Sequence, residues 1–252
     1  MTMRVDLNSD IGESFGAYCL GCDEEVIPLV TSVNIACGWH AGDALIMGKT
    51  VELAARQGVA VGAHPGYPDP MGFGRREIGV SPKEMKAYVQ YQIGAISAFC
   101  KASGVPLHHV KPHGAMYNQA ARDHSLAIAV CEGIAAVDDQ LILVGLAKSE
   151  LIRAADELGL RRCSEVFADR AYEEDGSLVS RKMKGSVITN MEECATRVIR
   201  MVKEGKVTTR TGLDISIEAD TICVHGDNPQ AVETIRILRK MLEQEQIEIM
   251  SF

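Results

Sequence analysis

Four histidines and two aspartates stand where a single chemical site could use them, near the ends of predicted strands. They are Asp6, Asp10, His40, His64, His113 and His225. Imidazole and carboxylate groups bind zinc or a similar divalent ion, and they also transfer protons without a metal. No two of the histidines have the i, i+4 spacing of a helical metal site. The sequence leaves both chemistries open, with Asp6, Asp10, His40 and His64 as the candidate metal ligands.

The sharpest short motif is Lys111-Pro112-His113-Gly114. Proline holds the preceding lysine in an extended conformation, and alternation along a strand places Lys111 and His113 on one side. A partly buried lysine can stabilise an oxyanion or a phosphate, and a neighbouring histidine can move protons. The alternative is a solvated lysine beside a structural histidine.

A loop rich in proline and glycine, residues 65–76, follows the short apolar strand that ends at His64. Proline and glycine at this density hold a backbone in set, non-helical shapes. The loop ends at Arg75 and Arg76, which we expect to hold a carboxylate or phosphate unless they are merely solvated. In a barrel, this loop would cover the mouth with His64 at its base.

Asp169 and Arg170 follow the sixth predicted strand and form another candidate anion site. A guanidinium offers parallel N–H donors, so Arg170 could clamp a carboxylate at two points. An ordinary surface ion pair is the alternative explanation of this pair.

Strand-like and helix-like segments alternate along the whole chain. The predicted strands are residues 4–8, 33–37, 59–64, 108–112, 141–146, 164–168 and 221–225. The predicted helices are residues 24–30, 43–57, 81–103, 123–136, 148–158, 192–203 and 229–246. Strict alternation indicates parallel strands with helical crossovers. Polar residues follow six of the seven strands, which favours a barrel mouth over the single switch point of an open sheet.

The sequence therefore predicts an α/β fold of one domain, residues 1–252, built as a seven-stranded parallel (β/α) barrel. With seven strands rather than eight, we expect this TIM-like barrel to be distorted or incompletely closed.

Composition excludes several classes of function. The chain has 252 residues, 46% of them apolar and 24% charged, with a net charge of -8. No apolar run reaches the roughly 18 residues of a membrane span, and the N-terminus lacks the apolar core of a signal peptide. We therefore expect a cytoplasmic protein with no membrane partner. No basic stripe with interleaved aromatic residues is present, so we expect no nucleic-acid partner.

Three short stretches look like known motifs but do not indicate a nucleotide, metal or redox site. Gly48-Lys49-Thr50 lacks the upstream glycine spacing of a P-loop and falls within a predicted helix. Gly72-Phe73-Gly74 is not a dinucleotide-binding fingerprint, because Glu77 stands where the third glycine belongs. Cys19 and Cys22 form a single CxxC pair, which is a weak metal or redox signal without a second pair.

Six stretches together resemble the LamB/YcsF family, the A subunits of bacterial 5-oxoprolinase. They are residues 6–13, 34–43, 64–76, 110–115, 167–172 and 224–227. The resemblance extends over about residues 4–245. It departs from the family pattern at Ser9 and Trp39, where cysteine and phenylalanine are expected. The only function that these departures put in doubt is that of a thiol at position 9.

The resemblance implies a barrel of the glycoside hydrolase/deacetylase kind. It also implies ATP-dependent opening of 5-oxo-L-proline to L-glutamate, with ADP and phosphate as products and separate B and C subunits as partners. A divalent metal could enter as Mg²⁺ with ATP or as a site-bound zinc-like ion. Because the chain has no P-loop, ATP could bind to this chain or at a site shared with a partner. The sequence is also compatible with a homo-oligomer.

Opening a lactam requires cations for phosphate and oxyanion, a base for water and a clamp for the substrate carboxylate. We predict that the catalytic residues are Asp10, His64, Lys111 and His113. The predicted substrate- or phosphate-binding residues are Asn8, His40, Arg75, Arg76, Asp169, Arg170 and His225. Two alternatives remain: a metal-dependent amidase or polysaccharide deacetylase that works without ATP, and a non-catalytic subunit that presents substrate to its partners.

Overall fold

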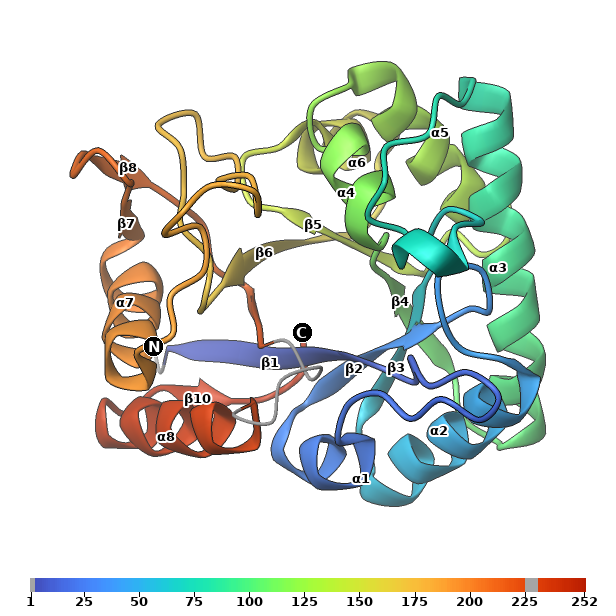
Figure 1. The fold of residues 1–252 in the computed structure, drawn as a ribbon, viewed down its shortest axis with the longest axis horizontal. Helices are drawn as coiled ribbons and strands as arrows, with labels where there is room; N and C mark the ends of the chain where they lie inside the picture. Colours follow the sequence, from blue (N-terminus) through green and yellow to red (C-terminus); the bar gives the residue numbers. More distant parts are fainter. Residues whose placement is uncertain (1–2, 225–230) are drawn as a thin grey trace.

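The structure is a computed structural model that describes residues 3–224 and 231–252. Within these residues, seven parallel strands close into a ring (Figure 1). In ring order they are β1 (Arg4–Ile11), β2 (Ser32–Ala36), β3 (Ala60–His64), β4 (Leu107–Val110), β5 (Ile142–Leu146), β6 (Arg162–Phe167) and β9 (Thr221–Cys223). Pairing of β9 with β1 closes the ring, which confirms the predicted seven-stranded parallel barrel. The ring is complete, and its irregularity is a register shift between Val61 and Gly62, where β3 pairs with β4.

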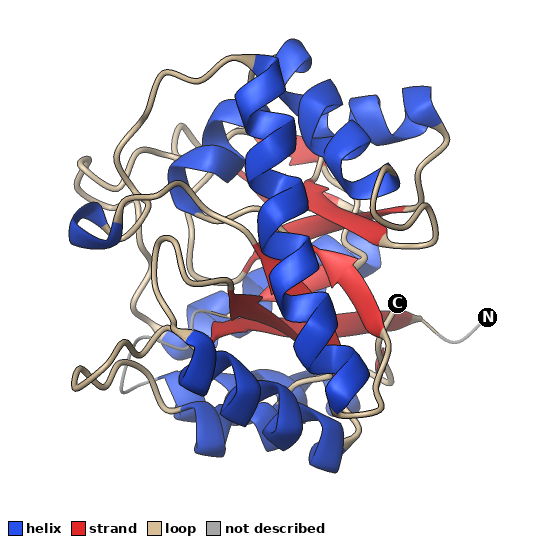
Figure 2. Ribbon diagram, turned by 90° about the vertical axis from the view of Figure 1, so that its right-hand side faces the viewer, coloured by secondary structure: helices blue, strands red, loops and turns tan. Residues whose placement is uncertain are grey.

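Helices cover the outside of the barrel, and the long loops gather on one side (Figure 2). The helices that the sequence predicts are α1 (Asp23–Val26) with the 3-10 turn η1 (Ile27–Leu29), α2 (Ala44–Gln57), α3 (Pro82–Ala102), α5 (His124–Ala135), α6 (Glu150–Leu158), α7 (Met191–Glu204) and α8 (Ala231–Gln244). Several ends follow from local chemistry. Asp43 caps α2, Ser81 and Glu84 form a capping box on α3, and Gly58 and Gly159 end α2 and α6 in left-handed conformations.

Five short elements were not predicted from the sequence. They are η2 (Pro70–Gly72), α4 (Gly114–Ala120), the antiparallel pair β7 (Lys206–Thr208) and β8 (Asp214–Ser216), and β10 (Glu248–Ile249), which pairs with the start of β1. Each is shorter than the window over which hydrophobic periodicity can be recognised.

The interior of the barrel is polar, whereas the layer between strands and helices is apolar. Leu7 and Ile11 on β1 belong to the apolar core, and the alternate residues of that strand turn inward. The inward polar side chains are Asp6, Asn8, Asp10, Asn34, His109, Lys111, Glu165 and Thr221. Because most barrels of this kind are filled by branched apolar residues, a hydrogen-bonded interior indicates a site rather than simple packing.

Candidate active site

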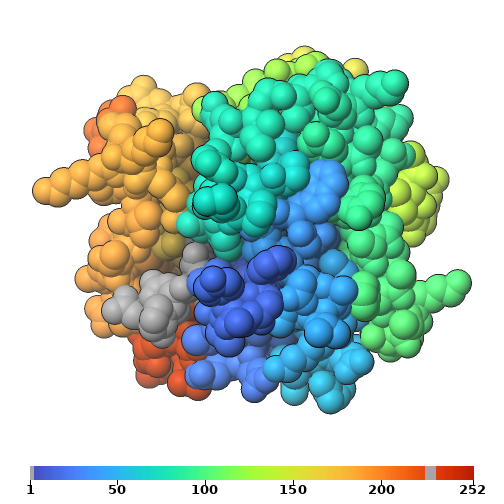
Figure 3. All heavy atoms as spheres, turned by 45° about the vertical axis from the view of Figure 1, so that its right-hand side comes forward, coloured from blue at the N-terminus to red at the C-terminus, as the bar shows by residue number. Residues whose placement is uncertain are grey.

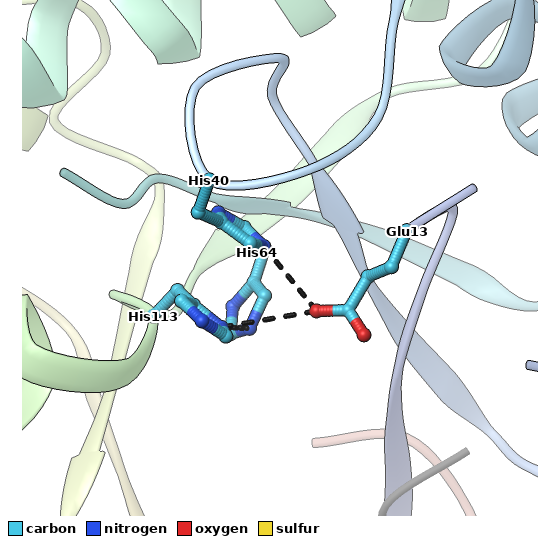
Figure 4. A group of neighbouring side chains, drawn as sticks. All are labelled: Glu13, His40, His64 and His113. Atoms are coloured by element: carbon cyan, nitrogen blue, oxygen red, sulfur yellow. Dashed lines mark hydrogen bonds and ion pairs between the residues drawn. The ribbon is translucent and has the colours of Figure 1, made fainter. Parts of the chain in front are cut away.

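A buried cluster of one glutamate and three histidines lies at the mouth of the barrel. Glu13, His40, His64 and His113 each offer one ligand atom, and these atoms lie within 4.8 Å of one another (Figure 4). Glu13 follows β1, His40 follows β2, His64 ends β3 and His113 follows β4. Four successive strands therefore deliver the cluster, as expected for the carboxyl ends of parallel barrel strands.

Two backbone carbonyls determine which ring nitrogens of His64 and His113 carry protons. His64 donates from Nδ1 to the carbonyl of Lys111 at 2.7 Å, and His113 donates from Nε2 to the carbonyl of Phe73 at 2.8 Å. A carbonyl can only accept, so the other nitrogen of each neutral ring bears a lone pair. These two nitrogens, Nε2 of His64 and Nδ1 of His113, lie 3.0 Å apart. Burial lowers the pKa of His113 well below its usual value and keeps that ring neutral.

Glu13 and His40 complete the cluster. Glu13 Oε1 lies 3.2 Å from His40 Nε2 and 3.8 Å from His113 Nδ1. The ring of His40 stacks on that of His113 with centroids 3.7 Å apart, and burial lowers the pKa of His40 well below its usual value. Converging lone pairs beside a carboxylate are suited to a divalent cation, because a cation removes their mutual repulsion. The donor set of three imidazoles and one carboxylate fits zinc or a similar ion.

Lys111 lies directly below this cluster, buried in the barrel. Its ammonium lies 2.7 Å from Glu165 Oε1, 2.9 Å from Asp10 Oδ1 and 3.2 Å from Asn8 Oδ1. Burial alone would lower the pKa of Lys111, but the negative charges around it, Asp10 foremost, raise the pKa well above its usual value. Lys111 is therefore a fixed cation.

Asp10 joins Lys111 to the histidine cluster. One carboxylate oxygen accepts from Lys111 Nζ at 2.9 Å and from Asn34 Nδ2 at 2.8 Å. The other oxygen lies 3.4 Å from His64 Nε2. Asp10 also lines the large pocket above the barrel, so its carboxylate is held in place and accessible to a ligand.

A cavity of about 1010 Å³ opens over Asp10 and the histidine cluster. Its floor includes Asp10, Glu13, His64, Lys111 and His113, and its walls carry the cationic residues Arg75, Arg76, Arg122, Lys148, Arg170, Arg181 and Lys182. The segments that follow β1 (dark blue) and β3 (teal) lie beside each other on the face in Figure 3. Phe73, in the loop after β3, packs edge-on against His40 and His113, so this loop covers the cluster as the sequence predicts.

Several predicted site residues meet in this arrangement. Asp10, His40, His64, Lys111 and His113 lie together, and Asn8 supports Lys111 from inside the barrel. Arg75 lies over the ring of Phe73 and lines the cavity. Predicted residue His225 lies outside the described residues.

Asp6 is not brought to the cluster, which corrects its prediction as a metal ligand. Its carboxylate accepts from the hydroxyls of Thr31, Ser32 and Thr221, at the amino-terminal end of the barrel. The alternation of β1 places Asp6 and Asp10 on the same face but about 13 Å apart along the strand, at roughly 3.3 Å per residue. Asp6 is a structural residue of the barrel floor.

Three other predicted binding residues, Arg76, Arg170 and Asp169, differ in their position relative to the cavity. Arg76 pairs with Asp69 and remains largely exposed at the cavity wall. Arg170 is buried and donates to the carbonyls of Val179 and Ser186, which fixes it at the same wall. Asp169 is half-buried and is not among the residues that line the cavity.

Sequence reasoning missed Glu13, Glu165 and Tyr117 as site residues. Glu13 stands outside the alternation of β1 because Gly12, with φ of 69°, turns the chain just before it. Glu165 is one of the polar residues near the end of the sixth strand, and the structure places it 2.7 Å from Lys111 Nζ. Tyr117 lies on α4, a helix that was not predicted, and its hydroxyl donates to Glu165 at 2.7 Å. Only Glu13 could have been predicted as a site residue from the sequence, because it belongs to the first of the stretches that resemble the family, residues 6–13.

The fold and site define a class: a closed, TIM-like α/β barrel with a buried histidine and glutamate cluster at the carboxyl ends of its strands. Within that class, this chain belongs to the LamB/YcsF family, whose sequence pattern matches residues 5–252.

Two relatives from different organisms carry the same name. The chain is 58% identical to a protein of Clostridium beijerinckii that is named as the A subunit of 5-oxoprolinase, over 98% of this chain and 96% of that protein. It is 57% identical to the protein of the same name from Pyrococcus horikoshii, over 98% and 97% of the two chains. A solved structure described as a lactam utilization protein from Thermus thermophilus superposes with a TM-score of 0.94 at 50% identity, covering 99% and 100% of the two chains.

More distant structures share the fold alone. A T48 deacetylase superposes with a TM-score of 0.51 at 14% identity, over 99% of this chain and 88% of that one. This likeness agrees with the predicted barrel of the deacetylase kind. Among the described residues, no helix is both long and apolar enough to cross a membrane.

Proposed function

We propose that this chain is the A subunit of a 5-oxoprolinase and that it opens 5-oxo-L-proline to L-glutamate in a reaction coupled to ATP hydrolysis. The names of relatives that match almost the whole chain support the substrate class. The observation that carries the chemistry is the buried Glu13/His40/His64/His113 cluster, linked through Asp10 to the fixed cation Lys111 beneath a polar cavity.

The reaction needs activation because a lactam carbonyl is a poor electrophile. Transfer of the ATP γ-phosphoryl group to the lactam oxygen would provide a good leaving group. The cationic walls of the cavity are suited to a phosphorylated, carboxylate-bearing ligand, since guanidinium groups bind both anions through parallel N–H donors. Arg75 and Arg170 are our candidates for the residues that orient it.

Glu13, His40, His64 and His113 would hold a divalent metal ion. When bound, such an ion supplies Lewis acidity that polarises a carbonyl oxygen or lowers the pKa of a water molecule. Neutral imidazole is the form that binds metals, and the burial that lowers the pKa values of His40 and His113 maintains that form.

The residues of the chain itself supply the base and its support. Asp10 accepts a proton from the attacking water, because its carboxylate borders the cavity. Lys111 and Asn34 hold one carboxylate oxygen, and the other oxygen lies 3.4 Å from His64 Nε2. Glu165 pairs with Lys111, and Tyr117 donates to Glu165, so both residues position Asp10 indirectly. A preorganised site of this kind avoids reorganisation during the reaction.

The word "subunit" in the names of the relatives indicates a multi-subunit complex. We propose that separate B and C subunits complete the enzyme. ATP would bind either in the cationic cavity of this chain or at a site shared with those partners.

The decisive experiment measures glutamate and ADP released from 5-oxoproline, with and without ATP, by this chain alone and with its B and C partners. We expect release only from the complete system with ATP, and loss of release in a Lys111→Ala complex. Release by this chain alone without ATP, with activity on N-acetylated sugars, would instead identify a metal-dependent amidase or deacetylase. Near-normal activity after joint replacement of His64, Lys111 and His113 by alanine would identify a non-catalytic binding subunit.

A further inference from the structure

In the mechanism above, no single residue is assigned a role on the wall of the cavity that the segments after β5 and β6 form. It consists of residues 146–150 and 175–182, and it lines the same cavity as Asp10 and His64. The two segments adjoin, since a Cβ placed on Gly176 would lie 3.7 Å from Cδ of Lys148. Lys148 is therefore held alongside the second segment, at the rim of α6.

Ser149 occupies the N-cap position of the nine-residue helix α6, but its hydroxyl makes no capping hydrogen bond. The residue is only 9% exposed, and its Oγ is buried without a hydrogen-bond partner among the described residues. Serine at an N-cap normally accepts from a backbone N–H in the first turn. A buried hydroxyl that forgoes this bond at a cavity wall indicates a binding group for a ligand, because unsatisfied buried polar groups are uncommon.

The N-terminus of α6 adds a partial positive charge at the same point. Its first turn has no side-chain cap: the backbone N–H of Glu150 donates to the carbonyl of Ala121 at 3.0 Å, and that of Arg153 donates to the carbonyl of Ser149 at 3.2 Å. Helix N-termini attract phosphate through unpaired N–H groups and the helix dipole. No sequence motif marks such a site, because the serine and lysine are single residues within an ordinary strand-to-helix connection.

The charges on this wall favour an anion. Lys148, Arg181 and Lys182 line it, against the carboxylates of Glu150 and Asp175, and Arg170 lines the same cavity. Glu150 is already engaged by His124 at 2.8 Å and by Arg153 at 3.2 Å. Asp175 accepts from the backbone N–H of Ser177. Burial, followed by the positive charge of Arg181, lowers the pKa of Arg170 to about 10, as expected where cations crowd together.

We propose that Ser149, Lys148 and the N-terminus of α6 form a phosphate subsite of this cavity. Its ligand carries a phosphoryl group, which either ATP or the phosphorylated lactam could present. Only the identity of the phosphate carrier rests on the function proposed above, whereas binding of phosphate by the chain does not.

The test measures binding to the isolated full chain by calorimetry, with inorganic phosphate, the non-hydrolysable ATP analogue AMP-PNP and the acyl phosphate acetyl phosphate as separate probes. Ser149→Ala and Lys148→Ala should each weaken binding about tenfold, which corresponds to loss of one hydrogen bond or one charge in the site. Lys83→Ala, which removes an exposed lysine of α3 outside the cavity, is the matched control and should bind normally.

A melting curve separates binding from folding. Ser149→Ala should melt at the same temperature as the parent protein or higher, because the change removes a hydroxyl that has no partner. Ser149→Asp, which places a negative charge in the same position, should abolish phosphate binding. Tighter binding of AMP-PNP than of acetyl phosphate would identify the nucleotide as the carrier, and the reverse order would identify the phosphorylated substrate.

The proposal is overturned if the parent chain binds none of the three probes at millimolar concentration. Equal weakening by Lys83→Ala and Lys148→Ala would also overturn it, since binding would then be non-specific. Phosphate binding that depends on Ser149, in a chain whose full complex releases no glutamate, would refute the proposed function and leave the subsite standing.

Discussion

Nε2 of His64 and Nδ1 of His113 lie 3.0 Å apart, and in neutral rings each is the nitrogen that a backbone carbonyl leaves without a proton. Two lone pairs at this distance repel each other unless a proton or a cation lies between them. The carboxylate of Glu13, 3.8 Å from His113 Nδ1, provides the negative charge that a cation requires. This relationship makes the cluster a candidate metal centre rather than a set of separate core histidines.

Replacing a ligand of this cluster should remove metal binding. His113→Ala and Glu13→Gln should each weaken zinc binding by more than the roughly 10–100-fold typical of residues that only support a ligand. Calorimetry with zinc and metal analysis of the purified protein measure the effect. His124→Ala is the control, because His124 lies on α5 and pairs with Glu150 and Glu157 at the surface. Unchanged zinc content in both cluster variants would rule out the metal centre.

Lys111→Met should strongly destabilise the fold. The substitution leaves the carboxylates of Asp10 and Glu165 without their cation, and breaking a buried ion pair typically costs about 3–5 kcal/mol. Urea denaturation measures this loss. In Lys49→Met, the matched control, the lost partner is the exposed Glu24, so the change in stability should be small. Equal effects of the two substitutions would show that the interior network contributes no stability.

Asp6 should make stability depend on pH. Burial raises its pKa from 3.8 to about 6. Between these values the unfolded chain releases the proton that the folded protein keeps, so the free energy of unfolding falls as pH rises. The shift corresponds to about 3 kcal/mol at 1.36 kcal/mol per pKa unit.

Asp6→Asn removes this titration while keeping a side chain that can bond the surrounding hydroxyls. Urea denaturation of both proteins at pH 4, 5, 6 and 7 measures the difference in stability. The variant should gain about 2 kcal/mol relative to the parent protein as pH rises over this range, because part of the shift is already expressed at pH 4. Because other groups titrate alike in both proteins, a difference that does not change with pH would contradict the assignment.

Gly62→Ala should disrupt the barrel interior. A Cβ at this position would lie 2.1 Å from Nε2 of His109, whose ring is held by Asn34 at 2.8 Å. Overpacking of this kind costs about 1–3 kcal/mol, or more where the neighbour cannot move. Gly94→Ala in the exposed part of α3 meets no atom within 4 Å and should stabilise the protein by up to about 1 kcal/mol. Thermal melting compares the two, and a stable Gly62→Ala protein would show that His109 can move aside.

Features that depend on neighbouring residues could be predicted from the sequence. The alternation of strands and helices indicated a parallel barrel, and Asp43 and Ser81 predicted where α2 and α3 begin. These predictions succeed because capping bonds and side-chain alternation are set within a few residues. The short helix α4 was missed, although it brings Tyr117 to Glu165, because seven residues are too few to show a helical period.

The sequence by itself determined which groups are available: imidazoles, carboxylates and a lysine near the ends of parallel strands. Only the tertiary structure decided which of them meet. Pairing of β9 with β1 completes the ring, and Gly12 turns Glu13 toward the histidines. Asp6 and Asp10 are four residues apart on β1, so Asp6 lies at the opposite end of the barrel. The physical reason is that periodicity sets the direction of a side chain, whereas its depth and partners depend on register between strands that are far apart in the sequence.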